Sequence, residues 1–320
     1  MAVYTEVNDA ALDAYLQAYD VGRVLSFKGI AGGVENTNYL LGTESGQYIL
    51  TLYEKRVAEE DLPFFIGLMD HLASAGFPCP RPIRNRHGEA LARLEGRAAA
   101  MVSFLDGVEV TKPLPEHCHA AGATMARLHA LAADFTIHRP NGLSPKAWPA
   151  LVESAINQAD DVEPGMANLM RGALEEAKAQ WPTNIPSGVI HADLFKDNVF
   201  FLDNSLSGVI DFYFACNDFL AYDLAIAINA WCFDKTLTFQ PELAKALVAG
   251  YQSVRPLEGN EVQALPILAR GAALRFLLTR INDWLNVPEG ALVIPHDPKQ
   301  FSARLRFFQA VQSPAELGVA

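Results

Sequence analysis

Two apolar segments near the middle of the chain end in side chains that can hold a proton or a metal ion. The stretch VIHADLFKDNVFF contains His191, Asp193 and Asn198, and the later stretch GVIDFYFA contains Asp211. A carboxylate can accept a proton, and an amide oxygen with a second carboxylate can bind Mg²⁺, which prefers oxygen ligands. Phosphoryl transfer to a hydroxyl requires this set of groups. One aspartate at a strand end usually only forms a turn, but the combination favours a catalytic site.

Two side chains of the same region are candidates for supporting roles. We expect His191 to hydrogen-bond the backbone around the loop, and so to position it, rather than to move a proton. Lys196 lies three residues after Asp193. It would either neutralise a transferring phosphoryl group or remain solvated, and the sequence leaves both interpretations open.

The elements that must position these groups are mostly helical. From residue 105 onward, apolar residues recur at the spacing of amphipathic helices. The pattern predicts helices over residues 117–132, 147–156, 166–181, 222–231, 241–251 and 262–285. The two stretches quoted above are the only β-like segments that we expect in this half of the chain.

The first hundred residues are β-rich. Apolar runs bounded by turn residues predict strands over residues 24–27, 38–42, 47–53, 90–93 and 98–104. A helix over residues 59–74 is expected to pack on this small antiparallel sheet. The predicted fold is therefore α+β, with an N-terminal lobe over residues 1–104, a hinge near residues 103–107 and a mainly helical lobe over residues 105–320.

Composition restricts the partners and the location. The chain has 320 residues, of which 50% are hydrophobic, so a large core in two lobes is expected. The net charge of −12 argues against a nucleic-acid partner. The four cysteines form no CxxC pair, which is typical of a reducing compartment. With no signal peptide and no apolar run of membrane-spanning length, we expect a cytoplasmic protein that acts on a small molecule.

Three segments of the chain resemble a known family. HADLFKDN resembles the H-x-D-x-x-x-x-N catalytic loop of kinases, Ile210–Phe212 resembles their metal-binding Asp-Phe-Gly segment, and NDFLAYDLA is similar to the run that follows it in aminoglycoside phosphotransferase-like kinases. The resemblance implies a bilobal protein-kinase-like fold and ATP as the phosphoryl donor. It also implies that Asp193 is the catalytic base and that Asn198 and Asp211 bind Mg²⁺. No activation-loop sequence follows Asp211, so we do not expect a peptide substrate.

The same resemblance assigns the nucleotide contacts to the first lobe. Gly32, Gly33 and Asn36 lie in the glycine-rich turn with which kinases cover the phosphates of ATP. Most glycine-rich hairpin turns bind no ligand, so this turn alone is a weak signal. At the hinge, the backbone of Ser103 and Leu105 would face adenine.

The third strand departs from the general kinase pattern. The family has a lysine or arginine in the middle of this strand, where the present chain has Thr51. Glu59 is the candidate for the acidic partner on the helix, because it precedes Leu62 by three residues and should share its packed face. A first-turn interaction with the helix dipole is the alternative role for Glu59.

Segments over nearly the whole chain resemble the type II homoserine kinases, among them VENTNY, YILTLYE and ALRF. In that family a threonine at position 51 is expected. The resemblance implies ATP-dependent phosphorylation of L-homoserine to O-phospho-L-homoserine, a step of threonine biosynthesis. A kinase for another small alcohol (an aminoglycoside, choline or a sugar) and a catalytically silent nucleotide-binding module are the alternatives, and the intact catalytic set speaks against the silent module.

The helix predicted over residues 262–285 supplies the candidates for binding L-homoserine, namely Arg275, Arg280 and Asp283. A guanidinium can hold a carboxylate with two parallel hydrogen bonds. Arg280 and Asp283 are three residues apart and could instead form an ordinary ion pair on one helix face.

Overall fold

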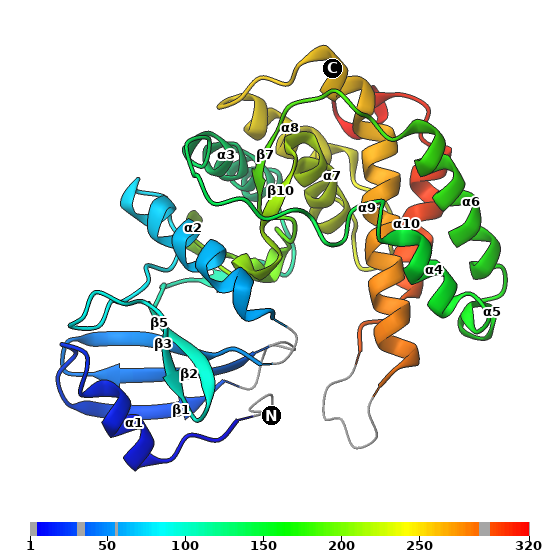
Figure 1. Cartoon of the computed structure of the whole chain (residues 1–320). Helices are drawn as coiled ribbons and strands as arrows, with labels where there is room; N and C mark the ends of the chain where they lie inside the picture. Colours follow the sequence, from blue (N-terminus) through cyan, green and yellow to red (C-terminus); the bar gives the residue numbers. More distant parts are fainter. Residues whose placement is uncertain (1–4, 31–35, 55–56, 288–294, 320) are drawn as a thin grey trace. The chain divides into compact units, whose positions relative to one another are not determined.

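The computed structural model of the chain describes residues 5–30, 36–54, 57–287 and 295–319. The chain divides into two compact units, of which one comprises Met1–Asp106 and the other Gly107–Glu289 with Ile294–Ala320. Figure 1 shows the elements of both units along the sequence.

A five-stranded antiparallel sheet forms the first unit. Its strand order is β1-β2-β3-β5-β4, and every neighbouring pair is antiparallel. The strands are β1 (Val24–Gly29), β2 (Thr37–Thr43), β3 (Gly46–Leu52), β4 (Ala92–Leu94) and β5 (Arg97–Ser103). The small antiparallel sheet that the sequence predicts is therefore confirmed, with strand ends that differ by a few residues.

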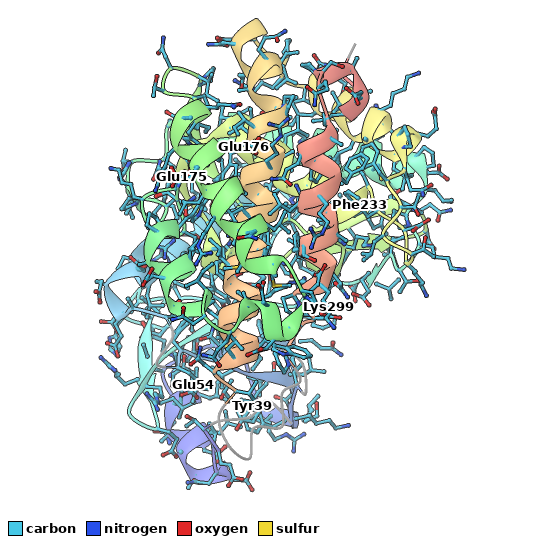
Figure 2. The ribbon with its side chains drawn as sticks, turned by 90° about the vertical axis from the view of Figure 1, so that its right-hand side faces the viewer. Tyr39, Glu54, Glu175, Glu176, Phe233 and Lys299 are labelled. Atoms are coloured by element: carbon cyan, nitrogen blue, oxygen red, sulfur yellow. The ribbon has the colours of Figure 1, made fainter. Side chains whose placement is uncertain are left out.

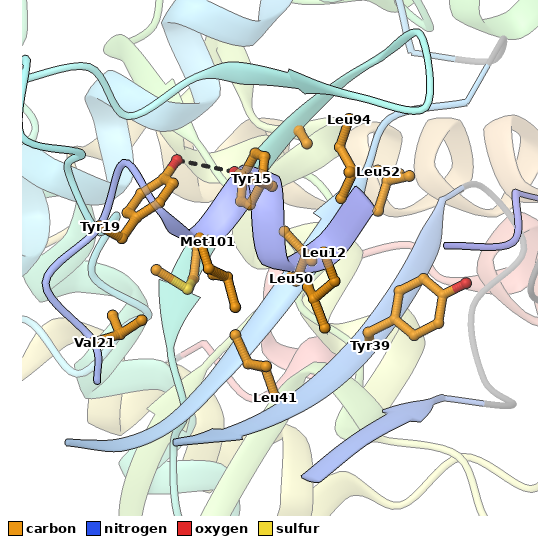
Figure 3. Packing of buried hydrophobic residues seen from close by; sticks show 12 residues of the cluster. Leu12, Tyr15, Tyr19, Val21, Tyr39, Leu41, Leu50, Leu52, Leu94 and Met101 are labelled. Carbon is orange, nitrogen blue, oxygen red and sulfur yellow. Dashed lines mark hydrogen bonds between the residues drawn. The ribbon is translucent and has the colours of Figure 1, made fainter. Parts of the chain in front are cut away.

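The core of this unit lies between the sheet and helix α1 (Asp9–Leu16). Alternate residues of the central strands point to one face, because side chains of a strand alternate with a period of two. The cluster shown in Figure 3 contains α1 residues and strand residues, among them Leu12, Tyr15, Leu41, Leu50 and Met101. Helix α1 thus packs on the sheet. The helix that the sequence predicts over residues 59–74 is present as α2 (Leu62–Ser74).

Helices dominate the second unit. They are α3 (Pro115–Leu131), α4 (Trp148–Ala155), α5 (Ala159–Val162), α6 (Met166–Gln180), α7 (Leu220–Trp231), α8 (Pro241–Gln252), α9 (Gly259–Leu285) and α10 (Lys299–Ala310). The six predicted helices are all present. The sequence did not predict α5 and α10. Helices α4, α6, α7 and α10 all contact α9, which is the central helix of this unit (Figure 1).

Helix α9 meets the length and composition of a membrane span, contrary to our expectation that no segment does. Its best window of 18 residues has a mean hydropathy of 1.2, and 72% of that window is buried inside the unit. Burial against the neighbouring helices explains the apolar composition, since a helix that is hydrophobic on most sides is typical of a protein core.

Short strands carry the segments that hold the candidate catalytic groups. Strands β7 (Ser187–Ile190) and β10 (Cys216–Phe219) form one pair, and β6 (Val108–Glu109), β8 (Val199–Leu202) and β9 (Ser205–Val209) form a second sheet. The expectation of only two β-like segments was wrong. Strands β6 and β10 contain polar residues without clear alternation, so the sequence pattern does not reveal them. They are strands because β6 pairs with β8 and β10 pairs with β7.

Helices α3 and α8 approach each other closely at two glycines. A Cβ atom at Gly122 would clash with the carbonyl oxygen of Leu247, and one at Gly250 with that of His119. Because neither neighbour is the end of a flexible side chain, the close approach requires glycine at both positions. These two helices carry residues that hold the catalytic loop, as described below.

We predict that Gly250→Ala destabilises the protein by about 1–3 kcal/mol, because the added methyl group overpacks the contact between α3 and α8. The measurement is the midpoint of urea unfolding followed by circular dichroism. Gly172→Ala on α6 is the matched control, since a Cβ atom at that position would meet no heavy atom within 4 Å. The control should be neutral or slightly stabilising, and an equal loss in both variants would contradict the packing argument.

Candidate active site

The loop after β7 carries Asp193 and has an unusual backbone conformation. Ala192 has a φ of 61°, in the left-handed region that residues other than glycine rarely adopt. Such a conformation persists only where the surrounding structure holds it. Three buried side chains from outside the loop supply these contacts: Asp223, Arg275 and Trp231.

The carboxylate of Asp223 holds two consecutive backbone amides of the loop. Its Oδ2 accepts from the N–H of His191 at 2.9 Å, and its Oδ1 accepts from the N–H of Ala192 at 2.8 Å. Asp223 lies on α7 and is completely buried. A charged acceptor makes stronger hydrogen bonds than a neutral one, so this residue stabilises the left-handed turn just before Asp193.

A chain of hydrogen bonds behind Asp223 extends through three helices. Nε2 of His129 lies 3.0 Å from Oδ2 of Asp223, and Nδ1 of His129 lies 2.9 Å from the hydroxyl of Tyr251. Arg255 donates to the same hydroxyl at 3.1 Å and to both carboxylate oxygens of Glu261 at 3.0 Å. These contacts link the buried carboxylate of Asp223 to that of Glu261.

Electrostatics keep Asp223 ionised. Burial acts to raise the pKa of its carboxyl group, but the hydrogen bonds from His129 and from the backbone N–H of His191 act against burial, and the net effect lowers the pKa below its usual value. Asp223 therefore acts as a permanent acceptor for the loop. In the sequence this residue belongs to the NDFLAYDLA run, and no role was expected for it there.

Two further contacts hold the carbonyl groups of the loop. Nη1 of Arg275 donates to the carbonyl oxygen of Ala192 at 2.6 Å, and the indole N–H of Trp231 donates to that of Leu194 at 2.8 Å. Arg275 is buried, and its guanidinium lies 4.1 Å from the ring centroid of Phe276. The peptide group before Ala192 is thus held by Asp223, and the peptide group after it by Arg275.

The segment that carries Asp211 is tied to the same loop. His191 is hydrogen-bonded through Nε2 to the carbonyl oxygen of Ile210 at 3.0 Å, and the N–H of Ile210 donates to the carbonyl oxygen of Asn198 at 3.0 Å. Burial lowers the pKa of His191, so its ring is neutral near pH 7. These bonds place residues 198 and 211 side by side, and Asp211 itself has a left-handed conformation with φ 63° and ψ 64°.

Asn198 and Asp193 are in direct contact. Nδ2 of Asn198 donates to the carbonyl oxygen of Asp193 at 2.8 Å and to its Oδ2 at 3.2 Å. Since the amide nitrogen is engaged in this way, the amide oxygen is the group of Asn198 that can bind a cation. The oxygens of Asn198 and Asp211 fit a Mg²⁺ ion that takes its other ligands from phosphate and water. Among the described residues, no three His, Cys, Asp or Glu side chains form a metal-binding group of their own.

Arg280 and Lys196, two candidate residues of the sequence analysis, both lie in the second unit. Nη1 of Arg280 donates to Oε1 of Gln300 at 2.9 Å. Burial lowers the pKa of Arg280 to about 10, while the negative charges of Asp193 and Asp197 act in the opposite direction. Lys196 is partly buried, and burial together with the charge of Arg304 lowers its pKa. Asp283 is exposed on α9.

The nucleotide candidates of the first unit are less completely defined. Gly32 and Gly33 lie outside the described residues. Asn36 is buried, and its Oδ1 accepts a hydrogen bond from the N–H of Glu54 at 3.3 Å. The N–H of Ser103 donates to the carbonyl oxygen of Arg81 at 2.9 Å, so that donor is already engaged, and Leu105 is partly buried.

The third strand carries a partly buried hydrogen bond at Thr51, the position where the sequence has no lysine or arginine. Oγ1 of Thr51 donates to Oδ1 of Asn38 on β2 at 2.7 Å, and Thr51 is buried. Glu59 is not on a packed helix face, contrary to the sequence prediction. It lies in a 3₁₀ turn before α2, where the helical spacing to Leu62 does not hold, and it binds Arg93 of β4 at 2.5 and 2.9 Å.

Comparisons with known proteins agree with this arrangement. A model of the phosphotransferase enzyme family matches residues 26–257. The homoserine kinase of Methylobacterium radiotolerans is 59% identical over 318 residues, which cover 99% of this chain and 99% of that protein. The homoserine kinase of Xanthobacter autotrophicus is 57% identical over 320 residues, which cover 100% of both. The chain belongs to the phosphotransferase enzyme family.

Solved structures show the same fold. Amicoumacin kinase hAmiN, in complex with AMP-PNP, Ca²⁺ and Ami, is 15% identical with a TM-score of 0.72, covering 94% of this chain and 92% of that chain. Spectinomycin phosphotransferase, in complex with ADP and spectinomycin, is 15% identical with a TM-score of 0.71, covering 98% of both chains. The α+β fold of the aminoglycoside phosphotransferase-like kinases, predicted from the sequence, is confirmed.

We predict that Asp223→Asn destabilises the protein by about 3–5 kcal/mol, the usual effect of breaking a buried charged network. An amide has one acceptor oxygen for three donors, so at least one loop amide or His129 loses its partner. Urea unfolding measures the change. Asp203→Asn is the matched control, because Asp203 is exposed and its φ of 48° suits asparagine. Equal stability of Asp223→Asn and wild type would contradict the anchoring role.

Proposed function

We propose that the protein transfers the γ-phosphoryl group of ATP to the hydroxyl of L-homoserine and forms O-phospho-L-homoserine, a step of threonine biosynthesis. The observation that carries this proposal is the identity of 57–59% over essentially the whole chain to proteins named homoserine kinase. The intact and tightly anchored loop around Asp193 supports catalysis rather than mere nucleotide binding.

Asp193 is the general base of the proposed reaction. Its carboxylate accepts the proton of the substrate hydroxyl as the oxygen attacks the γ-phosphorus, the bond from that phosphorus to the β–γ bridging oxygen breaks, and ADP leaves. Asn198 donates to the same carboxylate and restricts its orientation. His191, which is neutral and hydrogen-bonded to Ile210, positions the loop. Lys196 is proposed to face the transferring phosphoryl group.

Asn198 and Asp211 are the proposed ligands of Mg²⁺. The neighbouring hAmiN structure contains AMP-PNP with Ca²⁺, which supports a nucleotide and a divalent cation in this fold. Bound Mg²⁺ would neutralise charge on the phosphate groups of ATP. The hydrogen bonds of Ile210 to His191 and Asn198 keep the two ligand residues adjacent.

The first unit is proposed to be the nucleotide-binding lobe, and the second the catalytic and substrate lobe. Gly32, Gly33 and Asn36 would approach the phosphates, and the backbone of Ser103 and Leu105 would face adenine. For Ser103 the carbonyl oxygen is the group proposed to do so, because its N–H is engaged by Arg81. Glu59 remains a candidate for the nucleotide site. A contact of its carboxylate with the nucleotide site would compete with its ion pair to Arg93.

For the acceptor, Arg280 and Asp283 are the proposed contacts on α9. Arg275 of the same helix already donates to the loop carbonyl of Ala192, so its proposed contribution is to hold the loop beside the substrate. A cytoplasmic location is also proposed. The four cysteines are all free and buried, which is consistent with a reducing compartment.

A coupled ADP-release assay over a panel of small alcohols tests the proposed substrate. We predict that L-homoserine gives a kcat/KM at least about 100-fold above that of choline or an aminoglycoside, since neither presents an ammonium and a carboxylate together. ³¹P NMR of the product should show a phosphate monoester. Comparable turnover of an alcohol that lacks the carboxylate would contradict homoserine specificity, but not the kinase activity.

Asp193→Asn and Asp211→Asn should fail in different ways. Loss of a general base typically lowers kcat by about 10²–10⁴-fold, and we predict that Asp193→Asn does so at every Mg²⁺ concentration while Mg·ATP binding in calorimetry is retained. Asp211→Asn should weaken Mg·ATP binding and recover part of its activity as Mg²⁺ is raised. Identical Mg²⁺ dependence of wild type and Asp211→Asn would place the metal elsewhere.

A further inference from the structure

A pocket of about 460 Å³ lies within the second unit, beside the catalytic loop. Lys196, three residues after Asp193, forms part of its wall. The side chains that line the pocket include four cations and a single carboxylate, Asp234. In a chain with a net charge of −12, this local excess of positive charge is the opposite of the average surface. The composition of the wall favours an anionic group as the occupant.

Arg304 of α10 is the most unusual residue of this pocket. Only 8% of its surface is exposed, and its Nε and Nη1 atoms are buried without a hydrogen-bond partner among the residues that the structure describes. Nearly all other buried polar groups of proteins are hydrogen-bonded, because an unmet donor costs about 1–3 kcal/mol and a charged one more. The described part of the chain therefore provides no acceptor for the Nε and Nη1 donors of Arg304.

Aromatic rings hold this guanidinium in place. Its central carbon lies 4.5 Å from the ring centroid of Phe301 and 5.3 Å from that of Phe233. Figure 2 shows Phe233 beside α10. Stacking on ring faces leaves the in-plane N–H groups as the donors that can meet a ligand. The orientation of Arg304 is thus set before any ligand arrives.

The same rings connect Arg304 with the catalytic loop. Phe301 packs on Phe195, two residues after Asp193, with ring centroids 6.4 Å apart. Arg280 also lies over Phe301, at 4.5 Å, and it binds Gln300, which lines the pocket. Burial and the charge of Arg280 lower the pKa of Arg304 to about 10. Arg280 and Arg304 are therefore two neighbouring cations, and of the two only Arg304 lacks a hydrogen-bond acceptor among the described residues.

We propose that Arg304 binds the carboxylate of the amino-acid acceptor in this pocket. The proposal rests on the proposed homoserine kinase activity and adds a residue that no sequence motif indicates. A carboxylate supplies the acceptor oxygens that the buried guanidinium lacks, and its charge relieves the repulsion between Arg280 and Arg304. Binding there would orient the acceptor with its hydroxyl toward the loop of Asp193, so Arg304 determines specificity for an acceptor with a carboxylate.

The test compares L-homoserine with 3-aminopropan-1-ol, which is the same molecule without the carboxylate. Wild type, Arg304→Met and Arg304→Lys are assayed with both acceptors. Losing one partner of a buried charge pair costs about 2–5 kcal/mol, or roughly 30-fold and more in affinity. We expect the wild type to prefer L-homoserine by at least that factor, and Arg304→Met to lose most of the preference through a higher KM for L-homoserine. The KM for ATP should change little, and Arg304→Lys should retain an intermediate preference.

Arg306→Met is the matched control on the same helix. Arg306 is exposed and paired with Glu163, outside the pocket, so this variant should keep the full preference for L-homoserine. Without substrate, Arg304→Met should unfold at the same or a higher temperature than the wild type, because it removes a buried charge that has no partner among the described residues. A purely structural role of Arg304 predicts the opposite shift.

Two results would overturn the inference. One is an Arg304→Met variant that still prefers L-homoserine as strongly as the wild type, and the other is an Arg304→Met or Arg304→Lys variant that fails to fold. If the wild type phosphorylates both acceptors equally, homoserine specificity itself fails, and if it phosphorylates neither, the proposed function fails. Failure of the inference about Arg304 and failure of the proposed function are distinguishable, because the first is judged only when the wild type prefers L-homoserine.

Discussion

The buried carboxylate of Asp223 is the interaction on which the catalytic half of this protein depends. It accepts hydrogen bonds from two consecutive loop amides and from His129. Without it, the left-handed conformation of Ala192 would lose two of the hydrogen bonds that hold the loop just before Asp193. A charge at full burial is expensive, and the three donors around it are what make it stable. Asp223 is completely buried, so it holds the loop from inside the unit.

This dependence explains why helices far apart in the sequence are packed so closely. His129 lies on α3, Tyr251 on α8 and Glu261 on α9, and the hydrogen-bond chain that supports Asp223 passes through all three. Glycines at the contact of α3 and α8 allow the approach that brings His129 to Tyr251. The position of the loop therefore depends on the packing of these helices. A shift of α3 or α8 would move His129 or Tyr251 and so disturb the hydrogen bonds that support Asp223.

Two buried arginines of the second unit differ in whether the described residues provide acceptors for their N–H groups. Arg275 and Arg304 are both buried, but they have different surroundings. Arg275 donates to a backbone carbonyl and completes the loop, whereas Arg304 is stacked on rings and has no acceptor among the described residues. A guanidinium whose donors have acceptors in the protein stabilises the structure. A guanidinium whose donors have none can donate them to a ligand. Preorganisation of this kind lowers the cost of ordering the site when substrate binds.

Sequence alone determined the fold class and which loop matters. The spacing of His191, Asp193, Asn198 and Asp211 identifies the loop, and periodic apolar residues give the sheet and the main helices, because both signals are local. Tertiary structure decided what supports and surrounds that loop. Asp223 belongs to the NDFLAYDLA run, but its role in holding the loop was not expected from the sequence. Glu59 leaves the packed face because a 3₁₀ turn precedes α2, and Arg304 lies on a helix that the sequence did not predict. Their roles depend on burial and on partners up to a hundred residues away, and a local pattern contains neither.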